Sequence, residues 1–177
     1  MKINELKERI CRYPGVAALN AMQTSMSEDA VRTEGTTILL APTGSGKTLA
    51  FSFPLLAGIR PQGRVQAMVL APSRELVLQI GEVVRTLVAG DGLKVTVLYG
   101  GHSFKDEQQS LAVVPDVIVT TPGRMCDHIK RGSVDISTAR VLVIDEYDKM
   151  LELGFEDEMR RIVRRLTSLK RLVLTSA

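Results

Sequence analysis

The residues with the clearest chemical potential lie in one short segment, residues 41–48, whose letters read APTGSGKT. Two glycines, a lysine and a threonine at this spacing are typical of a loop that binds phosphate groups. Gly44 and Gly46 lack a Cβ, so the backbone can turn several N–H groups inward toward an anion. A helix that starts directly after the loop adds partial positive charge through its first unpaired N–H groups. We therefore predict that this segment binds the phosphates of a nucleotide.

Every residue of the segment is a candidate for contacting that nucleotide, and two of them have distinct roles. The Lys47 ammonium can reach the β- and γ-phosphates, and the Thr48 hydroxyl can occupy one position on Mg²⁺. The generic pattern begins with glycine, where this chain has Ala41. The alternative is a surface turn that happens to precede lysine and threonine. The predicted nucleotide-binding residues of the segment are Ala41, Pro42, Thr43, Gly44, Ser45, Gly46, Lys47 and Thr48.

A pair of carboxylates, Asp145 and Glu146, follows the apolar stretch 141–144. An acid at the end of a buried strand beside a phosphate loop is well placed to hold Mg²⁺, usually through water. We assign this metal role to Asp145. Because a general base must lie within hydrogen-bond reach of the nucleophile, we expect Glu146 to orient and polarise the attacking water. The alternative is that both acids only cap the helix that follows.

Three further segments carry groups that suit a phosphodiester backbone. The first and third combine polar side chains with the start of a predicted helix, and the second offers bare backbone N–H groups. Donors of this kind contact nucleic-acid phosphates without reading base edges. Each segment by itself is also explained as a helix start or a plain turn. The predicted contact residues are Pro72, Ser73, Arg74, Glu75, Gly100, Gly101, Thr121, Pro122, Gly123 and Arg124.

These segments need a scaffold, and the hydrophobic pattern predicts alternating strands and helices. Because the strands are apolar on both faces, they should form a parallel sheet covered by helices on two sides, with right-handed crossovers. The loops at the carboxyl ends of the strands then line one edge, where α/β folds bind ligands. The segments above, and residues 175–177, all lie at such ends. The predicted strands are 36–40, 65–70, 94–98, 117–120, 141–144 and 171–174. The predicted helices are one that ends at Pro14, then 19–31, one from the phosphate loop to about 54–58, 72–89, 104–111, 123–130 and 155–166.

Composition places the chain among globular proteins of one domain. It has 177 residues, of which 45% are hydrophobic and 24% charged, and this balance excludes a disordered chain. The net charge of +3 is compatible with a polyanionic partner but is too small to indicate one. No apolar run is long enough to cross a membrane. Two distant cysteines and two isolated histidines, His102 and His128, form no metal-binding pattern, so we expect reduced thiols in a cytoplasmic protein.

Taken in chain order, these segments resemble the motifs of the N-terminal RecA-like domain of DEAD-box RNA helicases in superfamily 2. The resemblance implies an α/β fold of the P-loop NTPase (RecA-like) type, a three-layer α/β/α sandwich with a mainly parallel sheet. It implies ATP hydrolysis coupled to RNA binding and local duplex unwinding, with ATP and Mg²⁺ as cofactors. The three contact segments would then grip RNA phosphates and 2′-hydroxyls without sequence specificity. The matching segments are 41–48 (motif I), 72–76 (Ia), 100–101, 121–124 (Ib), 145–148 (II) and 176–177 (the start of III).

The resemblance also assigns residues that the pattern alone does not. It implies that Asp148 is a catalytic residue bonded to Ser176 and Lys47, and that Ser176 couples the two domains of the family. Residues 15–23 align with the family's adenine-reading segment, with Gln23 as the adenine-contacting amide, because an amide both donates and accepts. The positions where this chain lacks the family's usual residue are Leu19, Asn20, Met22 and Tyr147.

We expect residues 1–177 to form a single RecA-like ATP-binding domain. Within it, residues 1–33 would be an N-terminal helical segment containing the adenine-reading motif, and residues 34–177 the P-loop core. The family's second RecA-like domain, with its arginine finger, is absent from this sequence. Since arginine fingers contribute roughly 10³–10⁵ in rate, we expect these residues alone to be monomeric, to bind nucleotide weakly and to hydrolyse and unwind almost nothing.

Two other functions remain open at this stage. The first is a superfamily 2 motor that acts on DNA, and the second is a nucleotide-dependent RNA clamp without turnover. An unrelated P-loop kinase would explain none of the other segments. The arginines at 160, 161, 164 and 165 follow an acidic helix start, so we interpret them as a solvated helix face whose charges complement the helix dipole.

Overall fold

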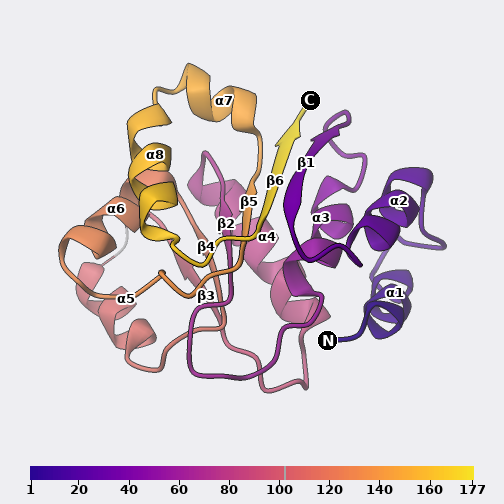
Figure 1. Cartoon of the computed structure of the whole chain (residues 1–177), viewed down its shortest axis with the longest axis horizontal. Coiled ribbons are helices and arrows are strands. Elements are labelled where there is room, and N and C mark those ends of the chain that lie inside the picture. Colours follow the sequence, from indigo (N-terminus) through magenta and orange to yellow (C-terminus); the bar gives the residue numbers. More distant parts are fainter. Residues whose placement is uncertain (102) are drawn as a thin grey trace.

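In the computed structural model, which describes residues 1–101 and 103–177, six parallel strands form one sheet in the order β1-β6-β5-β2-β4-β3 (Figure 1). His102, for which we expected no metal role, lies outside these residues. No helix in the described ranges is long and apolar enough to span a membrane. The strands are β1 (Gly35–Leu40), β2 (Ala67–Leu70), β3 (Val95–Leu98), β4 (Val117–Thr120), β5 (Val141–Ile144) and β6 (Arg171–Ser176).

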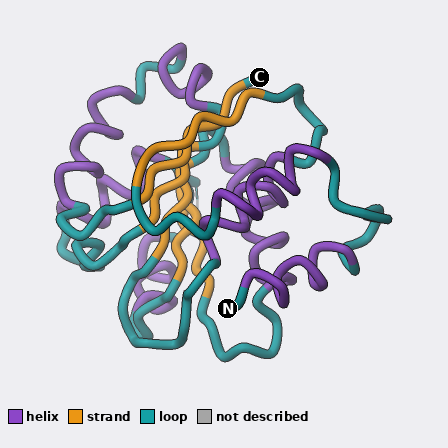
Figure 2. Tube along the Cα trace, turned by 45° about the vertical axis from the view of Figure 1, so that its right-hand side comes forward, coloured by secondary structure: helices purple, strands orange, loops and turns teal. Residues whose placement is uncertain are grey.

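Helices cover both faces of this sheet, which confirms the predicted three-layer sandwich (Figure 2). Successive residues of a strand point to opposite faces, so Ala67 and Val69 pack against α1–α4, whereas Met68 and Leu70 pack against α5–α8. The first layer contains α1 (Ile3–Cys11), α2 (Ala21–Asp29), α3 (Lys47–Leu56) and α4 (Arg74–Leu87). The second contains α5 (Phe104–Leu111), α6 (Pro122–Lys130), α7 (Tyr147–Glu152) and α8 (Glu156–Arg165).

The predicted cover of helices on both faces of the sheet was wrong for the first strand. Strand β1 lies at the edge of the sheet and pairs only with β6 among the described strands. Ile38 is 65% exposed and Leu40 is 70% exposed, whereas Leu39 is buried. Ile38 aligns with Leu174 on the face that α7 and α8 cover, and this cover stops before β1. An apolar, β-branched sequence therefore indicated a strand correctly but did not reveal its place in the sheet.

The remaining differences concern helix α7 and the ends of elements. Residues 147–152 form a helix that is not among the predicted ones. Helix α2 is shorter than predicted because the Asn20 side chain caps its start. Strand β6 continues through Ser176, two residues beyond the prediction, because it pairs with β1 along its whole length.

Backbone hydrogen bonds join the carboxyl ends of neighbouring strands. Ala41 N–H donates to the Ser176 carbonyl at 3.2 Å, and Asp145 N–H donates to the Leu70 carbonyl at 2.9 Å. Farther along the same edge, Thr121 N–H donates to the Leu98 carbonyl at 3.2 Å. The register of the sheet thus brings the phosphate loop, the acidic pair and the predicted nucleic-acid segments to one edge, as the sequence predicted.

Candidate functional site

The phosphate loop connects β1 to α3, as predicted. Gly44 has φ +78° and Gly46 has φ +87°, values that favour glycine because it has no Cβ. The Lys47 ammonium bends back over the loop, donating to the Pro42 carbonyl at 3.1 Å and also to the Ala41 carbonyl. The Ser45 hydroxyl is buried and lacks a partner within the described part of the chain. The loop therefore offers an ammonium and a hydroxyl whose present contacts an anion could replace or complete.

The segment preceding β1 holds this loop from the side. Asn20 and Gln23 form a reciprocal capping box at the start of α2. From there the Asn20 amide donates to the Ser45 carbonyl at 3.0 Å, and the Gln23 amide donates to the Gly46 carbonyl at 3.4 Å. Gln23 is buried, and a Cβ at position 46 would lie 2.6 Å from its nitrogen. The predicted adenine-contacting amide thus braces the phosphate loop in this structure, and its adenine contact stays a prediction.

Asp145 lies at the end of β5, two strands away from β1, and is buried. Burial raises the pKa of its carboxyl group above the ordinary value, and the neighbouring Glu146 acts in the same direction. A hydrogen bond donated by the Thr175 hydroxyl and the positive charge of Lys47 act to lower that pKa. Lys47 and Asp145, 98 positions apart in the chain, thus lie close enough to interact electrostatically.

The backbone of Glu146 adopts φ +51° and ψ +52°, a left-handed conformation at the start of α7. It is the single non-glycine residue with positive φ in the described ranges. Its N–H donates to the Thr175 hydroxyl at 3.1 Å, and its carboxylate lies 3.1 Å from the Lys149 ammonium. A strained backbone at a predicted catalytic position is an observation that the sequence did not indicate.

Asp148 and Ser176 are neighbours across β6 and α7. Burial acts to raise the pKa of Asp148, but the nearby Ser176 side chain and backbone N–H groups outweigh it, so the pKa is lowered. The buried Oδ1 of Asp148 has no hydrogen-bond partner in the described part of the chain, so the implied bond between Asp148 and Ser176 stays a prediction. The implied link to Lys47 is not formed among the described residues, because the Lys47 ammonium is bonded to the loop carbonyls instead.

The first two predicted nucleic-acid segments meet at the ends of β2 and β3. The Ser73 hydroxyl accepts from Leu76 N–H at 3.2 Å and so caps α4. The Arg74 guanidinium lies over the Tyr99 ring, 4.8 Å from its centroid. Gly101 has φ +80°, and a Cβ there would lie 3.9 Å from an Arg74 nitrogen. Motif Ia and the glycine pair therefore form one contiguous surface, on which Glu75 and Gly100 are also exposed.

The third segment is more enclosed than the sequence suggested. Thr121 and Gly123 are partly buried, and Pro122 is buried as the first residue of α6. The Arg124 side chain is 12% exposed, and its Nε donates to the Glu107 carboxylate at 2.5 Å. Sequence reasoning missed Glu107. The one available signal was its spacing of four residues from Leu111, which places both on the buried face of α5.

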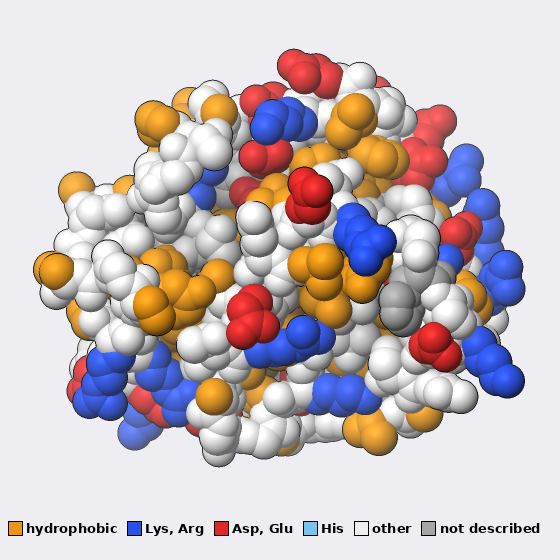
Figure 3. All heavy atoms as spheres, turned by 180° about the vertical axis from the view of Figure 1, so that it is seen from behind, with side chains coloured by type: hydrophobic (Ala, Val, Ile, Leu, Met, Phe, Trp, Pro, Cys, Tyr) orange, Lys and Arg blue, Asp and Glu red, His pale blue; other side chains and the backbone are white. Residues whose placement is uncertain are grey.

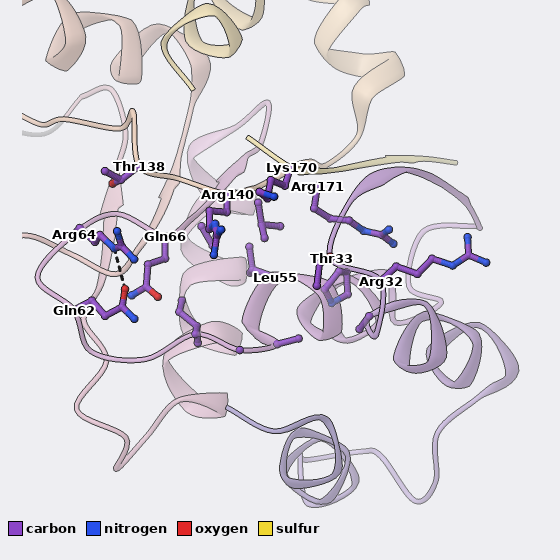
Figure 4. A pocket seen from close by; sticks show the side chains of 17 residues that line it. Arg32, Thr33, Leu55, Gln62, Arg64, Gln66, Thr138, Arg140, Lys170 and Arg171 are labelled. Carbon is purple, nitrogen blue, oxygen red and sulfur yellow. Dashed lines mark hydrogen bonds between the residues drawn. The ribbon is translucent and has the colours of Figure 1, made fainter. Parts of the chain in front are cut away.

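A cavity of about 400 Å³ lies at the amino ends of the strands, away from the candidate site at their carboxyl ends (Figure 4). Arg64 and Arg140 line that cavity, and its other cations are paired: Lys170 with Glu34, and both Arg32 and the buried Arg171 with Asp29. No phosphate loop or strand-end carboxylate opens into it. The distribution of surface charge does not indicate a binding site on the face shown in Figure 3, since basic and acidic side chains are interspersed there.

Comparison with known proteins gives a consistent result. Residues 20–177 match the DEAD/DEAH box helicase family. The ATP-dependent RNA helicase DeaD of Klebsiella pneumoniae is 42% identical over 140 residues, which cover 78% of this chain and 22% of that protein. For the DeaD protein of Haemophilus influenzae the identity is 40%, over 78% of this chain and 23% of that protein. The chain thus spans less than a quarter of the length of these curated relatives.

Two solved structures share the fold over most of this chain. A hypothetical ATP-dependent RNA helicase from Sulfolobus tokodaii superposes with a TM-score of 0.85 at 31% identity, covering 98% of this chain and 50% of that one. A DEAD box protein from the hyperthermophile Methanococcus jannaschii superposes with a TM-score of 0.80 at 30% identity, covering 88% of this chain and 43% of that one.

Proposed function

We propose that this chain, which belongs to the DEAD/DEAH box helicase family, is the ATP-binding domain of an ATP-dependent RNA helicase. In this proposal residues 34–177 form the P-loop core and residues 1–33 brace it. The rest of the whole protein supplies a second RecA-like domain. The observation that carries the proposal is that β6 joins the two halves of the site: Ala41 N–H at the start of the loop donates to the Ser176 carbonyl, and the neighbouring Thr175 hydroxyl donates to Asp145.

The phosphate loop binds the triphosphate of ATP in this scheme. The Lys47 ammonium exchanges the carbonyls of Ala41 and Pro42 for phosphate oxygens, which are stronger, charged acceptors. The N–H groups at the start of α3 face the same anion and add the partial charge of the helix end. The glycines keep the loop free of side chains, so the phosphates can approach the backbone closely.

The oxygen atoms of Thr48 and Asp145 would hold Mg²⁺, with Asp145 acting through water. The fit rests on Asp145, because a divalent cation beside this buried carboxylate offsets the cost of its ionised form. When bound, Mg²⁺ neutralises charge on the phosphates. Glu146 orients the attacking water and accepts its proton, and Asp148 with Ser176 transmits the state of the site to the second domain.

RNA lies along the same edge and is held through its backbone. The exposed Arg74, the glycine pair and the start of α6 supply a cation and backbone donors. These groups contact phosphates and sugars and make no contacts with base edges. RNA binding is therefore strong at low salt and does not depend on the RNA sequence.

The test is RNA-stimulated ATP hydrolysis by the whole protein. Glu146→Gln should retain ATP affinity and lose at least a hundredfold in turnover, because the amide cannot accept the proton of water. Glu152→Gln, an exposed position at the end of the same helix, is the matched control and should behave like the parent. Unchanged hydrolysis in Glu146→Gln would remove this residue from its proposed role.

The same assay separates the two alternatives. Stimulation by single-stranded DNA equal to that by RNA would favour a DNA motor. A whole protein that binds ATP and RNA together but shows no turnover would favour a clamp.

A further inference from the structure

We infer that Glu107 is a positioning residue that fixes the three predicted RNA-contacting segments relative to one another, an inference that rests on the proposed function. Glu107 lies on α5, a polar helix to which neither the sequence motifs nor the proposed mechanism assigns a role. Its side chain is nevertheless only 4% exposed. A carboxylate is seldom buried unless specific partners hold it, so this one needs an explanation.

Both carboxylate oxygens of Glu107 accept hydrogen bonds from the predicted RNA-binding edge. Oε1 accepts from the Tyr99 backbone N–H at 3.0 Å, directly before the glycine pair. Oε2 accepts from Arg124 Nε at 2.5 Å and from His128 Nε2 at 2.8 Å, both on α6. One side chain therefore joins the end of β3 to the helix that begins with motif Ib.

Ring contacts extend this connection to motif Ia. Arg74 lies over the ring of Tyr99, the residue whose N–H Glu107 holds. On the other side, the Phe104 ring stacks on the buried His128 ring, with centroids 4.4 Å apart and planes 18° apart. The Arg124 guanidinium lies 4.9 Å from the centroid of the same Phe104 ring. Motif Ia, the glycine pair and motif Ib thus depend on one set of contacts.

The arrangement requires a carboxylate. Two groups that can only donate, Tyr99 N–H and Arg124 Nε, point at different oxygens of Glu107, and a carboxylate can accept at both. An amide at this position would turn its own NH₂ group toward a donor, leaving at least one buried group unpaired. Since a carboxylate oxygen can only accept, His128 donates through Nε2, and its Nδ1 has no partner in the described part of the chain. Glu107→Gln therefore keeps the size of the side chain and removes the connection.

The role differs from that of a contact residue. Glu107 is too buried to touch RNA, and Arg124, with Nε bound to it, is largely enclosed. What Glu107 fixes is the orientation of the exposed donors around it. Its loss should raise the RNA concentration needed for half-maximal stimulation and leave turnover at saturating RNA close to that of the parent.

The experiment compares Glu107→Gln with Asp106→Asn in the whole protein. Asp106 is the preceding residue of α5, is exposed, and loses the same charge. ATP hydrolysis is measured against RNA concentration, and ATP affinity without RNA is measured separately. We expect Glu107→Gln to raise the half-saturating RNA concentration about tenfold, with ATP affinity and saturated turnover within about twofold of the parent. Asp106→Asn should match the parent in all three quantities.

An equal half-saturating RNA concentration in Glu107→Gln and the parent would overturn the inference. So would an equal loss of saturated turnover and ATP affinity, which indicates general loss of structure. Amide hydrogen exchange of residues 98–101 gives a readout that needs no RNA, and it should accelerate in Glu107→Gln alone. If the parent shows no RNA stimulation, the proposed function fails. Faster exchange would then still support Glu107 as the anchor of this loop, and unchanged exchange would refute it.

Discussion

The left-handed backbone of Glu146 allows a sharp test of the site's geometry. At most helix positions, glycine is less stable than alanine, by about 1 kcal/mol. At φ +51° the order should reverse, because glycine adopts this conformation without steric cost. We therefore predict that Glu146→Gly is more stable than Glu146→Ala.

The size of the reversal follows from two opposing effects. A residue with a Cβ in the left-handed conformation costs roughly 1–2 kcal/mol. Glycine gives back about 0.4–1 kcal/mol through the greater freedom of its unfolded chain. Both variants lose the contact between Glu146 and Lys149, which therefore cancels from the comparison. The net expectation is that Glu146→Gly exceeds Glu146→Ala in free energy of unfolding by about 0.5–1 kcal/mol.

Urea denaturation of the four variants at two positions measures this difference. Gln79, an exposed residue in the middle of α4, provides the ordinary helical position, where the alanine variant should be the more stable by about 1 kcal/mol. If glycine and alanine rank the same way at both positions, the backbone of Glu146 is not strained and the reasoning fails. A reversal at position 146 alone shows that the predicted catalytic carboxylate is held in place at a cost in stability.

Three further changes test neighbouring features. Gly46→Ala should lower the free energy of unfolding by about 2 kcal/mol in urea titrations, because its Cβ would lie 2.6 Å from the Gln23 nitrogen and φ is +87°; a loss below about 0.5 kcal/mol would contradict the close contact. Asp145→Asn should stabilise the fold at pH 7 by about 1 kcal/mol. Burial raises the pKa of Asp145 in the folded state, so the parent loses stability as the pH rises from the ordinary aspartate pKa to this raised pKa. At a pH below both pKa values the carboxyl group is protonated, and the advantage of the variant should vanish. An advantage that persists at low pH would refute this explanation. Lys47→Ala should weaken binding of a fluorescent ATP analogue at least tenfold while urea unfolding stays nearly unchanged; equal affinity would remove Lys47 from the phosphate site.

The sheet and the phosphate loop were predictable because their signals are local. Alternating apolar strands and helices, with turn residues at each strand's carboxyl end, limit the chain to few topologies. The glycines of residues 44 and 46 have positive φ as the loop pattern requires. The edge position of β1 was not predictable in this way, because an apolar strand looks alike in sequence whether or not a helix covers it.

Features that depend on distant residues were also beyond the sequence. Nothing near Glu107 indicates that Tyr99, Arg124 and His128 converge on it, since those partners come from two other elements. Likewise, no local sequence pattern predicts a left-handed conformation for Glu146. Its backbone N–H donates to the hydroxyl of Thr175, which lies on another strand. The local sequence pattern therefore predicted the candidate site residues, whereas the contacts that support these residues are visible only in the structure.

The open edge of the sheet has a consequence for how this molecule meets other chains. Strand β1 is paired on one side only within the described residues, so its outer N–H and C=O groups can extend the sheet by one more strand. Ile38 and Leu40 would give such a strand apolar side chains to pack against. Because β1 leads directly into the phosphate loop, an added strand would end beside the entry of that loop.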